Sequence, residues 1–363
     1  MGDSILDGIK VVELATYIAG PASGVVLADF GAEVIKVEPP NRPDPFRGGH
    51  LRGSDAPKSK YPYGYIIDNR NKKGIALDIK EPVGRAAFDK LVAGADVFIT
   101  NMPIPTRERL NIGYDAIRVI NQRIVYASIS AYGEKGPEAG RPGFDSTALW
   151  ARTGLMDLVK PGPDSPPARS LPGMGDHPTA MSLFAAIMTG LFRRERTGEG
   201  SHVSTSLMAN GVWWNGLLTQ AMLCGGKVVC RPPRENAGNP MHNLYQTRDG
   251  RWIHIIFNTN LHRWPEFAAL IDRPELGDDP RFESQPARIE NSALLIPILE
   301  QAFAERDFDE WVRLLDENRF TFGDIRKIDD ILTDPQMFEG RVLRPIEEEA
   351  AGADYIVDTP IWV

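Results

Sequence analysis

The stretch KVVELATYIAGPASGVVLADFGAEVIKVE, residues 10–38, decides the fold. It has short apolar runs at 10–14 and 31–38, rich in the β-branched residues that favour strands. The segment between them, 22–30, has the small and branched apolar residues of a packed helix. A strand, a helix and a second strand in this order predict a parallel βαβ unit.

The same alternation continues through the first half of the chain. We expect helices at 81–93 and 114–121 and further strands at 75–78, 96–100 and 124–128. Short apolar strands separated by helices predict an α/β fold with a doubly wound, Rossmann-like parallel sheet. The first strand does not lead into Gly-x-Gly-x-x-Gly, which disfavours a dinucleotide cofactor. It leads into Ala19-Gly20-Pro21-Ala22, which is either a tight strand-to-helix turn or a place where a ligand lies close to a helix N-terminus.

The second half predicts a smaller α+β domain. Residues 182–223 are mainly helical with an interruption at 197–205, and a linker is expected at about 226–240. A strand at 252–256 and a helix pair at 287–306 and 307–317 follow, with late strands at 341–346 and 355–357. The predicted domains are therefore 1–225, a large Rossmann-like domain, 226–335, a small domain with its linker at about 226–240, and a return segment at 336–363.

Composition excludes several classes of protein. The 363 residues carry a net charge of −8, which argues against a nucleic-acid or anionic-membrane surface. No apolar run approaches the roughly 20 residues of a transmembrane helix, and Met1–Ser4 does not begin a signal peptide. Two cysteines indicate a reducing, cytoplasmic setting, and six scattered histidines predict no metal site.

The candidate catalytic group is Asp176, in the glycine-lined turn at 173–178 that enters a helix. A carboxylate there lies in the positive field of the helix N-terminus, and at its ordinary pKa of about 3.9 it is ionised and needs no base. Backbone N–H groups of the turn are expected to stabilise an oxyanion. The alternative is a simple N-cap. Asp145 is a possible assisting carboxylate, and a direct contact between Asp176 and His177 is not expected.

Cations gather in the segment 69–74, which contains Arg70, Lys72 and Lys73. Arg107 and Arg109 follow the strand at 96–100. In an acidic chain this cluster is the best candidate for binding phosphate, although solvated surface charges are an equal alternative. The Pro- and Gly-rich loop at 42–63 is either functional or a surface excursion.

These segments, in this order, resemble the family III CoA-transferases, a group that includes formyl-CoA, carnitine and bile-acid CoA-transferases and the related α-methylacyl-CoA racemases. The resemblance is carried by Leu6–Leu14, Ala19–Ala22, Leu27–Glu38, Asn71–Lys73, Leu77-Asp78, Asn101, Arg109-Leu110, Gly175-Asp176 and Arg196–Gly200. It implies a large Rossmann-like domain, a small domain and two subunits interlocked as a homodimer.

The resemblance also implies the chemistry. The family's nucleophilic aspartate falls on Asp176, which forms aspartyl anhydride and aspartyl-CoA thioester intermediates as CoA passes from an acyl-CoA to a carboxylic acid. No tightly bound cofactor or metal is expected, since CoA is a substrate. The implied CoA contacts are Ile18, Ala19, Leu77, Lys80, Asn101, Met102, Arg109 and Arg141. Lys72 is also expected to bind a phosphate of CoA.

Phe144 decides between the two branches of the group. In the racemases the sequence at this point resembles Gly-His-Asp, and the histidine is one of two acid/base groups. This chain has Gly143-Phe144-Asp145 instead, and phenylalanine cannot carry a proton. A transferase is therefore expected. The alternatives are a racemase or isomerase that pairs Asp176 with His177 or Asp145, and a CoA-binding homologue without activity.

Two departures from the family concern the second half. Residues 235–241 keep Asn-Ala-Gly but lack the polyglycine loop that covers the intermediate in formyl-CoA transferases. The sequence ends at 360–363, before the family's usual C-terminal helical tail. The acyl groups stay open; a medium-sized or aromatic acid is suggested by Tyr17, Phe46, Trp150, Trp213 and Trp214.

Overall fold

The computed structural model describes residues 4–48, 57–257, 261–346 and 352–363. The chain divides into two units. The larger contains residues 1–157, 168–228 and 338–363, and the smaller contains 158–167 and 229–337. The short segment 158–167 thus belongs with the second half of the chain.

The larger unit is built on a six-stranded sheet in the order β3-β2-β1-β4-β5-β6, with every neighbouring pair parallel. Its strands are β1 (Lys10–Leu14), β2 (Glu33–Glu38), β3 (Lys73–Ala76), β4 (Val97–Thr100), β5 (Val125–Ser130) and β6 (Ser201–Ser206). This order is that of a doubly wound Rossmann-like fold, so the fold class predicted from the sequence is confirmed. All six carboxyl ends lie at one edge, where such sheets bind ligands.

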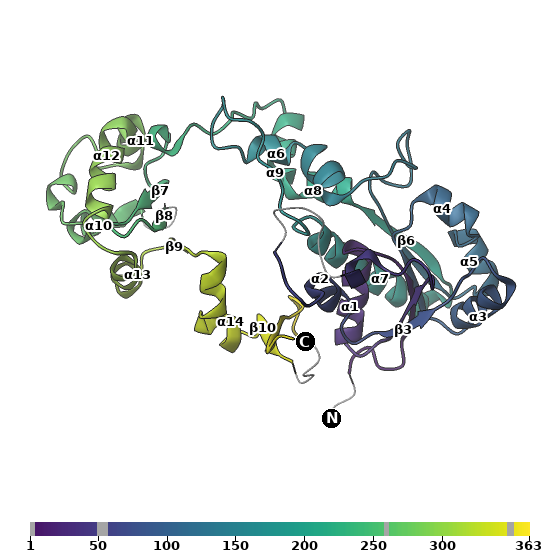
Figure 1. Ribbon diagram of the computed structural model, residues 1–363. Coiled ribbons are helices and arrows are strands. Elements are labelled where there is room, and N and C mark those ends of the chain that lie inside the picture. Colours follow the sequence, from purple (N-terminus) through teal and green to yellow (C-terminus); the bar gives the residue numbers. More distant parts are fainter. Residues whose placement is uncertain (1–3, 49–56, 258–260, 347–351) are drawn as a thin grey trace. The chain divides into compact units, whose positions relative to one another are not determined.

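Helices cover both faces of this sheet (Figure 1). On one face α1 (Ala19–Asp29) and α7 (Asp176–Thr197) pack against each other and against β1, β4 and β5 through Leu27, Leu183 and Ile187. On the other face α3 (Pro82–Ala93) and α5 (Tyr114–Ile120) bury Phe88 and Ile117. The unit also contains α2 (Tyr63–Asn69), α4 (Ile104–Arg109), α8 (Leu207–Trp214) and α9 (Gly216–Leu223), with a 3-10 turn at Pro45–Gly48 and a π-helical turn at Asp145–Ala151. The short helix α6 (Leu155–Leu158) begins in this unit and ends at the first residue of the next.

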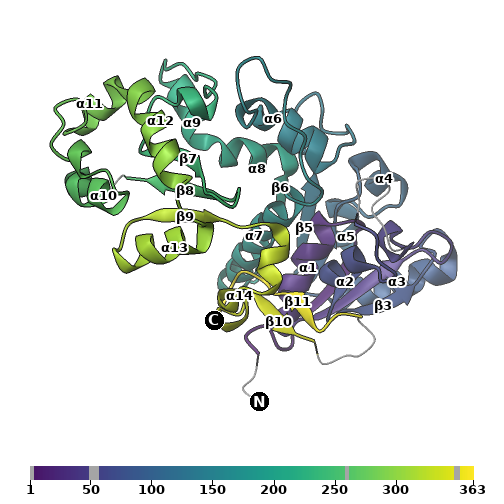
Figure 2. The same ribbon diagram turned by 60° about the vertical axis from the view of Figure 1, so that its left-hand side comes forward.

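The C-terminal residues return to the larger unit as an antiparallel pair, β10 (Leu343–Pro345) and β11 (Tyr355–Val357), drawn in yellow in Figure 2. Val357 and Trp362 line a mostly apolar hollow of about 540 Å³ together with residues of α1, α2 and the start of α7. The C-terminal segment therefore belongs to the surroundings of the first turn of α7.

The smaller unit packs helices on an antiparallel sheet in the order β7-β8-β9. The strands are β7 (His242–Gln246), β8 (Trp252–Ile256) and β9 (Phe322–Ile325), and the helices are α10 (Trp264–Leu270), α11 (Gln285–Glu290), α12 (Ser292–Phe303) and α13 (Phe308–Glu317). The short helix α14 (Pro335–Glu339) spans the boundary between the units. The core of the smaller unit includes Tyr245, Ile253, Phe303 and Trp311, so one face of its sheet is buried beneath helices.

Several elements differ from the sequence prediction. Helix α1 begins at Ala19, so Ala19–Ala22 is its first turn and not a loop. Strand β6 falls in the interruption expected at 197–205, and β7 follows directly on the predicted linker. Part of the loop predicted at 42–63, residues 49–56, lies outside the described residues. Among the described residues, no helix is long and apolar enough to cross a membrane.

Candidate active site

Asp176 is the first residue of α7, at the end of the glycine turn. Gly173 has φ +78°, in the left-handed region that favours glycine. A Cβ on Gly175 would stand 2.8 Å from Cβ of Asp145 and 3.0 Å from Cδ1 of Leu149, so the turn packs too closely for a side chain there. These two glycines bring Asp176 against the π-helical turn.

Asp145 lies directly beside this turn. It is buried, and its Oδ2 accepts a hydrogen bond from the backbone N–H of Gly175 at 3.2 Å, while Oδ1 accepts one from Ser146 at 2.6 Å. The two carboxylates that the sequence singled out are therefore neighbours in space. Their distance in sequence, 31 positions, gave no indication of this.

The environment of Asp176 changes its expected ionisation. Burial raises its pKa to about 7, the nearby charge of Asp145 adds to the shift, and His177 opposes it. The expectation of an ordinary, fully ionised carboxylate is therefore wrong. No described residue donates a hydrogen bond to this carboxylate, and a like charge beside a poorly solvated carboxylate disfavours the anion.

His177 pairs with Asp68 and not with Asp176. Its Nε2 lies 2.9 Å from Oδ1 of Asp68, a buried carboxylate on α2. Burial alone would lower the pKa of His177, but the hydrogen bond and charge of Asp68 outweigh it and raise that pKa. Sequence reasoning missed Asp68, because nothing near residue 68 shows that it would meet residue 177.

Three backbone donors of the glycine turn are already occupied. The N–H of Met174 bonds to the carbonyl of Leu171, that of His177 to the carbonyl of Gly173, and that of Gly175 to the carboxylate of Asp145. In this conformation these three N–H groups are not available for an oxyanion. The oxyanion role expected of the turn stays a prediction, and it would fall to the remaining N–H groups, those of Gly173 and Asp176.

The loop after β1 forms another side of the site. A methyl of Ile18, Cδ1, lies 3.4 Å from where a Cβ on Gly173 would stand. The ring of Tyr17 makes edge contacts with Phe46 and Phe144, each with centroids 5.8 Å apart. Phe144 is 60% exposed. This chain thus presents an apolar ring at the position where the resemblance implies a histidine in the racemases.

The side chain of Asn101, which follows β4, bonds to the loop after β1. Its Oδ1 accepts from the N–H of Thr16 at 3.0 Å, and its Nδ2 donates to the carbonyl of Thr16 at 2.6 Å. Ala19 is buried at the start of α1. Leu77 and Met102 are partly buried against the apolar cluster beneath α3 and α5. These four predicted contacts thus lie just after the carboxyl ends of β1, β3 and β4.

Lys80 and Arg109, both predicted CoA contacts, line one hollow of about 520 Å³. Both side chains are exposed, and the guanidinium of Arg109 approaches the hydroxyl of Thr106 at 3.5 Å. Arg85 also lines this hollow, where it bonds to Asp89 and to the carbonyls of Leu110 and Asn111. A hollow with three cations suits an anionic ligand.

Lys72 and Arg141 are placed differently. The ammonium of Lys72 is buried and bonds to Glu13 at 2.8 Å and to two carbonyls, and burial lowers its pKa to about 8. The ammonium of Lys72 is therefore not free to bind a phosphate, and the prediction that Lys72 contacts CoA is withdrawn. Arg141 is exposed, pairs with Glu138 and lies over the ring of Tyr132 at 4.8 Å.

The aromatic residues proposed to shape an acyl pocket fall into separate groups. Tyr17 and Phe46 are in contact, and Trp150 meets Trp214 with centroids 6.3 Å apart. Trp213 is 82% exposed and contributes to neither group. Within the described part of the chain, no group of three or more His, Cys, Asp or Glu residues is placed to hold a metal ion.

The chain matches the model of the family described as CoA-transferase family III over residues 6–362. It is 32% identical over 360 residues to the (R)-2-hydroxy-4-methylpentanoate CoA-transferase of Clostridioides difficile, covering 98% of this chain and 88% of that protein. It is 31% identical over 349 residues to the succinyl-CoA:glutarate CoA-transferase of Homo sapiens, covering 96% and 77%.

Solved structures show the same architecture. A CAIB/BAIF family protein from Brucella suis superposes with a TM-score of 0.85 at 29% identity, covering 99% of this chain and 93% of that one. Rv3272 from Mycobacterium tuberculosis superposes with a TM-score of 0.83 at 28% identity, covering 99% and 92%.

Proposed function

The chain belongs to CoA-transferase family III, an enzyme family that exchanges CoA between acyl-CoA and carboxylic acids, and we propose that Asp176 is the nucleophile of this exchange. One observation carries the proposal. Asp176 is a poorly solvated carboxylate at a helix N-terminus, without a hydrogen-bond donor among the described residues and beside a second carboxylate.

The first half-reaction loads CoA onto the enzyme. A carboxylate oxygen of Asp176 attacks the thioester carbonyl of the donor, the carbon–sulfur bond breaks, and CoA leaves as a thiolate. The thiolate then attacks the aspartyl carbonyl of the mixed anhydride. The donor leaves as a free carboxylate, and an aspartyl-CoA thioester remains.

The second half-reaction reverses these steps with the acceptor. Its carboxylate attacks the aspartyl thioester and expels CoA thiolate, forming a second anhydride. The thiolate attacks the acceptor carbonyl and releases Asp176 as a carboxylate. No proton is consumed or released, and the thioester bond is conserved.

The surroundings of Asp176 favour acylation. Burial and the charge of Asp145 disfavour its anion, so the carboxylate is more basic than an exposed aspartate. Forming the anhydride or the thioester removes the negative charge and with it the repulsion from Asp145. The same features that raise the pKa therefore make the ionised form a better nucleophile.

Lys80 and Arg109 are the proposed phosphate contacts of CoA, with Arg85 as a third cation. Leu77, Asn101 and Met102 follow strand ends at the same edge of the sheet, and Ile18 and Ala19 follow the end of β1. A ligand along this edge matches the usual binding position in doubly wound sheets.

A homodimer is also part of the proposal. Helix α9 has no buried residue, and Trp213, Leu217 and Leu223 on α8 and α9 are each at least 75% exposed. Large exposed apolar side chains on two consecutive helices are typical of a protein interface. Replacing Leu217 by Glu is expected to yield monomers in analytical ultracentrifugation, whereas an unchanged oligomer would exclude this surface.

Location in a reducing cytoplasm stays a prediction from the cysteine content. Cys224 and Cys230 are both free thiols. Cell fractionation with an antibody to the protein tests the prediction.

The replacement Asp176→Ala tests the proposed role. Loss of the nucleophile is expected to lower transfer between acyl-CoA and acid by at least about 1,000-fold. Asp115→Ala is the matched control, because Asp115 is exposed on α5. Turnover of the Asp176→Ala protein within about tenfold of wild type contradicts the assignment.

A further inference from the structure

Asp68 lies near the end of α2, where its side chain meets the first turn of α7. The side chain is only 2% exposed, and its Oδ1 lies 2.9 Å from Nε2 of His177. Its Oδ2 has no hydrogen-bond partner among the described residues. A buried carboxylate with an unpartnered oxygen is costly, so the charge of Asp68 depends strongly on the bond to His177.

The backbone at this point is held by the buried ammonium of Lys72. That ammonium donates to the carbonyl of Asp68 at 2.8 Å and to the side-chain oxygen of Asn69 at 3.2 Å. It also pairs with Glu13, a residue of β1, at 2.8 Å. The end of α2 is thereby fixed to the sheet, and with it the carboxylate that His177 meets.

The ring of His177 lies between α2 and the glycine turn. A Cβ on Gly173 would stand 3.5 Å from its Nδ1, and the ring lines the mostly apolar hollow of about 540 Å³ described above. Adjacent residues of a helix point in different directions, so His177 does not bond to Asp176. Its influence on Asp176 is therefore that of a nearby charge.

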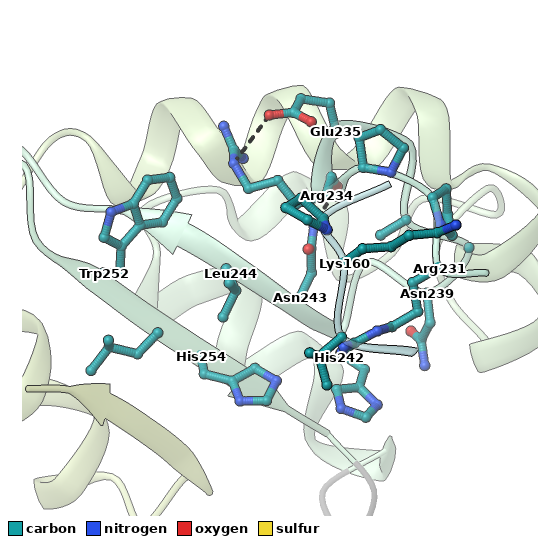
Figure 3. Close-up of a pocket in the computed structure, with 17 residues that line it drawn as sticks. Lys160, Arg231, Arg234, Glu235, Asn239, His242, Asn243, Leu244, Trp252 and His254 are labelled. Atoms are coloured by element: carbon teal, nitrogen blue, oxygen red, sulfur yellow. Dashed lines mark hydrogen bonds and ion pairs between the residues drawn. The ribbon is translucent and has the colours of Figure 1, made fainter. Parts of the chain in front are cut away.

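A histidine elsewhere in the chain shows what burial does without a carboxylate. In the smaller unit His242 and His254 line a hollow of about 850 Å³, where their rings stack with centroids 5.3 Å apart (Figure 3). Neither ring bonds to a carboxylate among the described residues, and burial, with the charge of His242, lowers the pKa of His254. Burial acts on His177 in the same sense, but the hydrogen bond and charge of Asp68 outweigh it and raise the pKa.

Other charges near the pair have partners of their own. Arg70, whose charge opposes that of the imidazolium, pairs with Asp29 of α1 at 2.6 Å. Asp358 lines the same hollow and pairs with Arg344 at 3.2 Å. The charge on His177 therefore depends mainly on the carboxylate to which it is bonded.

We propose that Asp68 is a positioning residue of the CoA exchange, which holds the imidazolium of His177 beside Asp176 and so keeps the nucleophile ionised against the charge of Asp145. The inference rests on the proposed role of Asp176. A cation near a carboxylate favours its charged form, whereas a like charge disfavours it. All four residues belong to the larger unit, and Asp68 acts through His177 without touching the reacting atoms.

The charge of His177 can be measured without turnover. Nitrogen-15 NMR of the histidine-labelled full-length protein follows its ring, whose signal is assigned by its loss in His177→Gln. Asp68→Asn removes the charge but keeps an oxygen that accepts a hydrogen bond. The midpoint of the His177 titration is therefore expected to fall by at least about one pH unit, and Asp68→Ser is expected to have the same effect.

Asp358→Asn is the matched control for this titration. Asp358 is a carboxylate of the same hollow, but its partner is Arg344 and not His177. An unchanged His177 midpoint in the Asp68 variants overturns the proposal, as does an equal fall in Asp358→Asn.

Carbon-13 NMR of aspartate carboxyl groups, with the Asp176 signal assigned through Asp176→Asn, measures the effect on the nucleophile. Loss of the Asp68 charge by itself favours ionisation of Asp176, whereas loss of the imidazolium disfavours it and is the larger effect. Asp68→Asn is therefore expected to raise the Asp176 midpoint by about half a pH unit. In the His177→Gln protein the same replacement is expected to lower it. Shifts of the same sign in both proteins would show that Asp68 does not act through His177, and would overturn the proposal.

Transfer kinetics separate this inference from the role of Asp176. In Asp68→Asn the acidic limb of kcat/KM is expected to move to higher pH, with the plateau above it nearly unchanged. A plateau lowered at every pH, without movement of the limb, would show a purely structural role and overturn the proposal. If Asp176→Ala retains CoA transfer, the proposed nucleophile is wrong, while the two NMR titrations still decide whether Asp68 controls the ionisation of Asp176.

Discussion

The Oδ2 atom of Asp145 accepts a hydrogen bond from the N–H of Gly175 at 3.2 Å, and this contact fixes a carboxylate beside the residue that precedes Asp176. The bond serves two purposes. It holds the glycine turn against the π-helical turn, and it keeps a negative charge near Asp176. Position and reactivity of the proposed nucleophile therefore depend on the same side chain.

The rate of CoA transfer should depend on the ionisation of Asp176. The ionised form is reactive, so kcat/KM is expected to rise with pH, with a midpoint near the pKa of about 7, and to level off above it. Asp145→Asn removes a negative charge but keeps an oxygen that accepts from Gly175. The midpoint is then expected to move to lower pH by roughly one unit. A midpoint that stays in place in Asp145→Asn contradicts the coupling.

His177 should act in the opposite sense. Its positive charge lowers the pKa of Asp176, while its hydrogen bond to Asp68 keeps its own pKa raised. His177→Gln removes the charge, so the acidic limb of the pH–rate profile is expected to move to higher pH. Thermal unfolding of the same protein shows whether the fold persists. If Asp145→Asn and His177→Gln shift the acidic limb in the same direction, the charges of these two residues do not explain the pH dependence of the transfer rate.

Gly175 should tolerate no side chain. A Cβ there would stand 2.8 Å from Cβ of Asp145, a distance at which something has to move. Gly175→Ala is expected to displace the turn and lower kcat by at least about 100-fold, because nucleophilic attack requires close alignment. Gly94→Ala is the control, since its nearest contact would be an ordinary 3.8 Å. Normal kcat in Gly175→Ala contradicts the described packing.

Lys80 and Arg109 should contribute to CoA affinity and not to chemistry. Each replacement by alanine is expected to raise KM for acyl-CoA about tenfold, with kcat largely retained, because a charge-assisted bond to phosphate is lost. The effect is expected to shrink at high salt. Arg118→Ala, an exposed cation on α5 outside the hollow, provides the comparison. If Arg118→Ala raises KM for acyl-CoA as much as the replacements of Lys80 and Arg109, the hollow that these two residues line is not the phosphate-binding site.

The sheet could be predicted from the sequence because its central strands are mostly apolar on both faces. β1 and β4 are buried between helices, and their valine- and isoleucine-rich runs show this directly. β6, Ser201–Ser206, is an edge strand of serine, threonine and histidine with one valine, so it lacks that signal. Only its pairing with β5 identifies it as a strand.

The candidate site could be predicted only in part. Asp176 stands out because glycines surround it, but the contacts of Asp145 with Gly175 and of Asp68 with His177 join residues far apart in the chain. Lys72 appears in the sequence as one cation among several near a loop. The fold buries it with Glu13, which a count of charges does not reveal.

We propose that Asp176 carries CoA during turnover, and covalent labelling checks this without a coupled assay. The protein is incubated with a panel of acyl-CoAs and examined by intact-mass spectrometry, then by treatment with hydroxylamine and peptide mapping. We expect a CoA-sized adduct that hydroxylamine converts to a hydroxamate at Asp176 and that Asp176→Ala abolishes. A hydroxamate at another residue would exclude Asp176 as the carrier. A protein that binds CoA and forms no adduct, but exchanges the α-proton of an acyl-CoA with deuterated water, would be a racemase or isomerase instead.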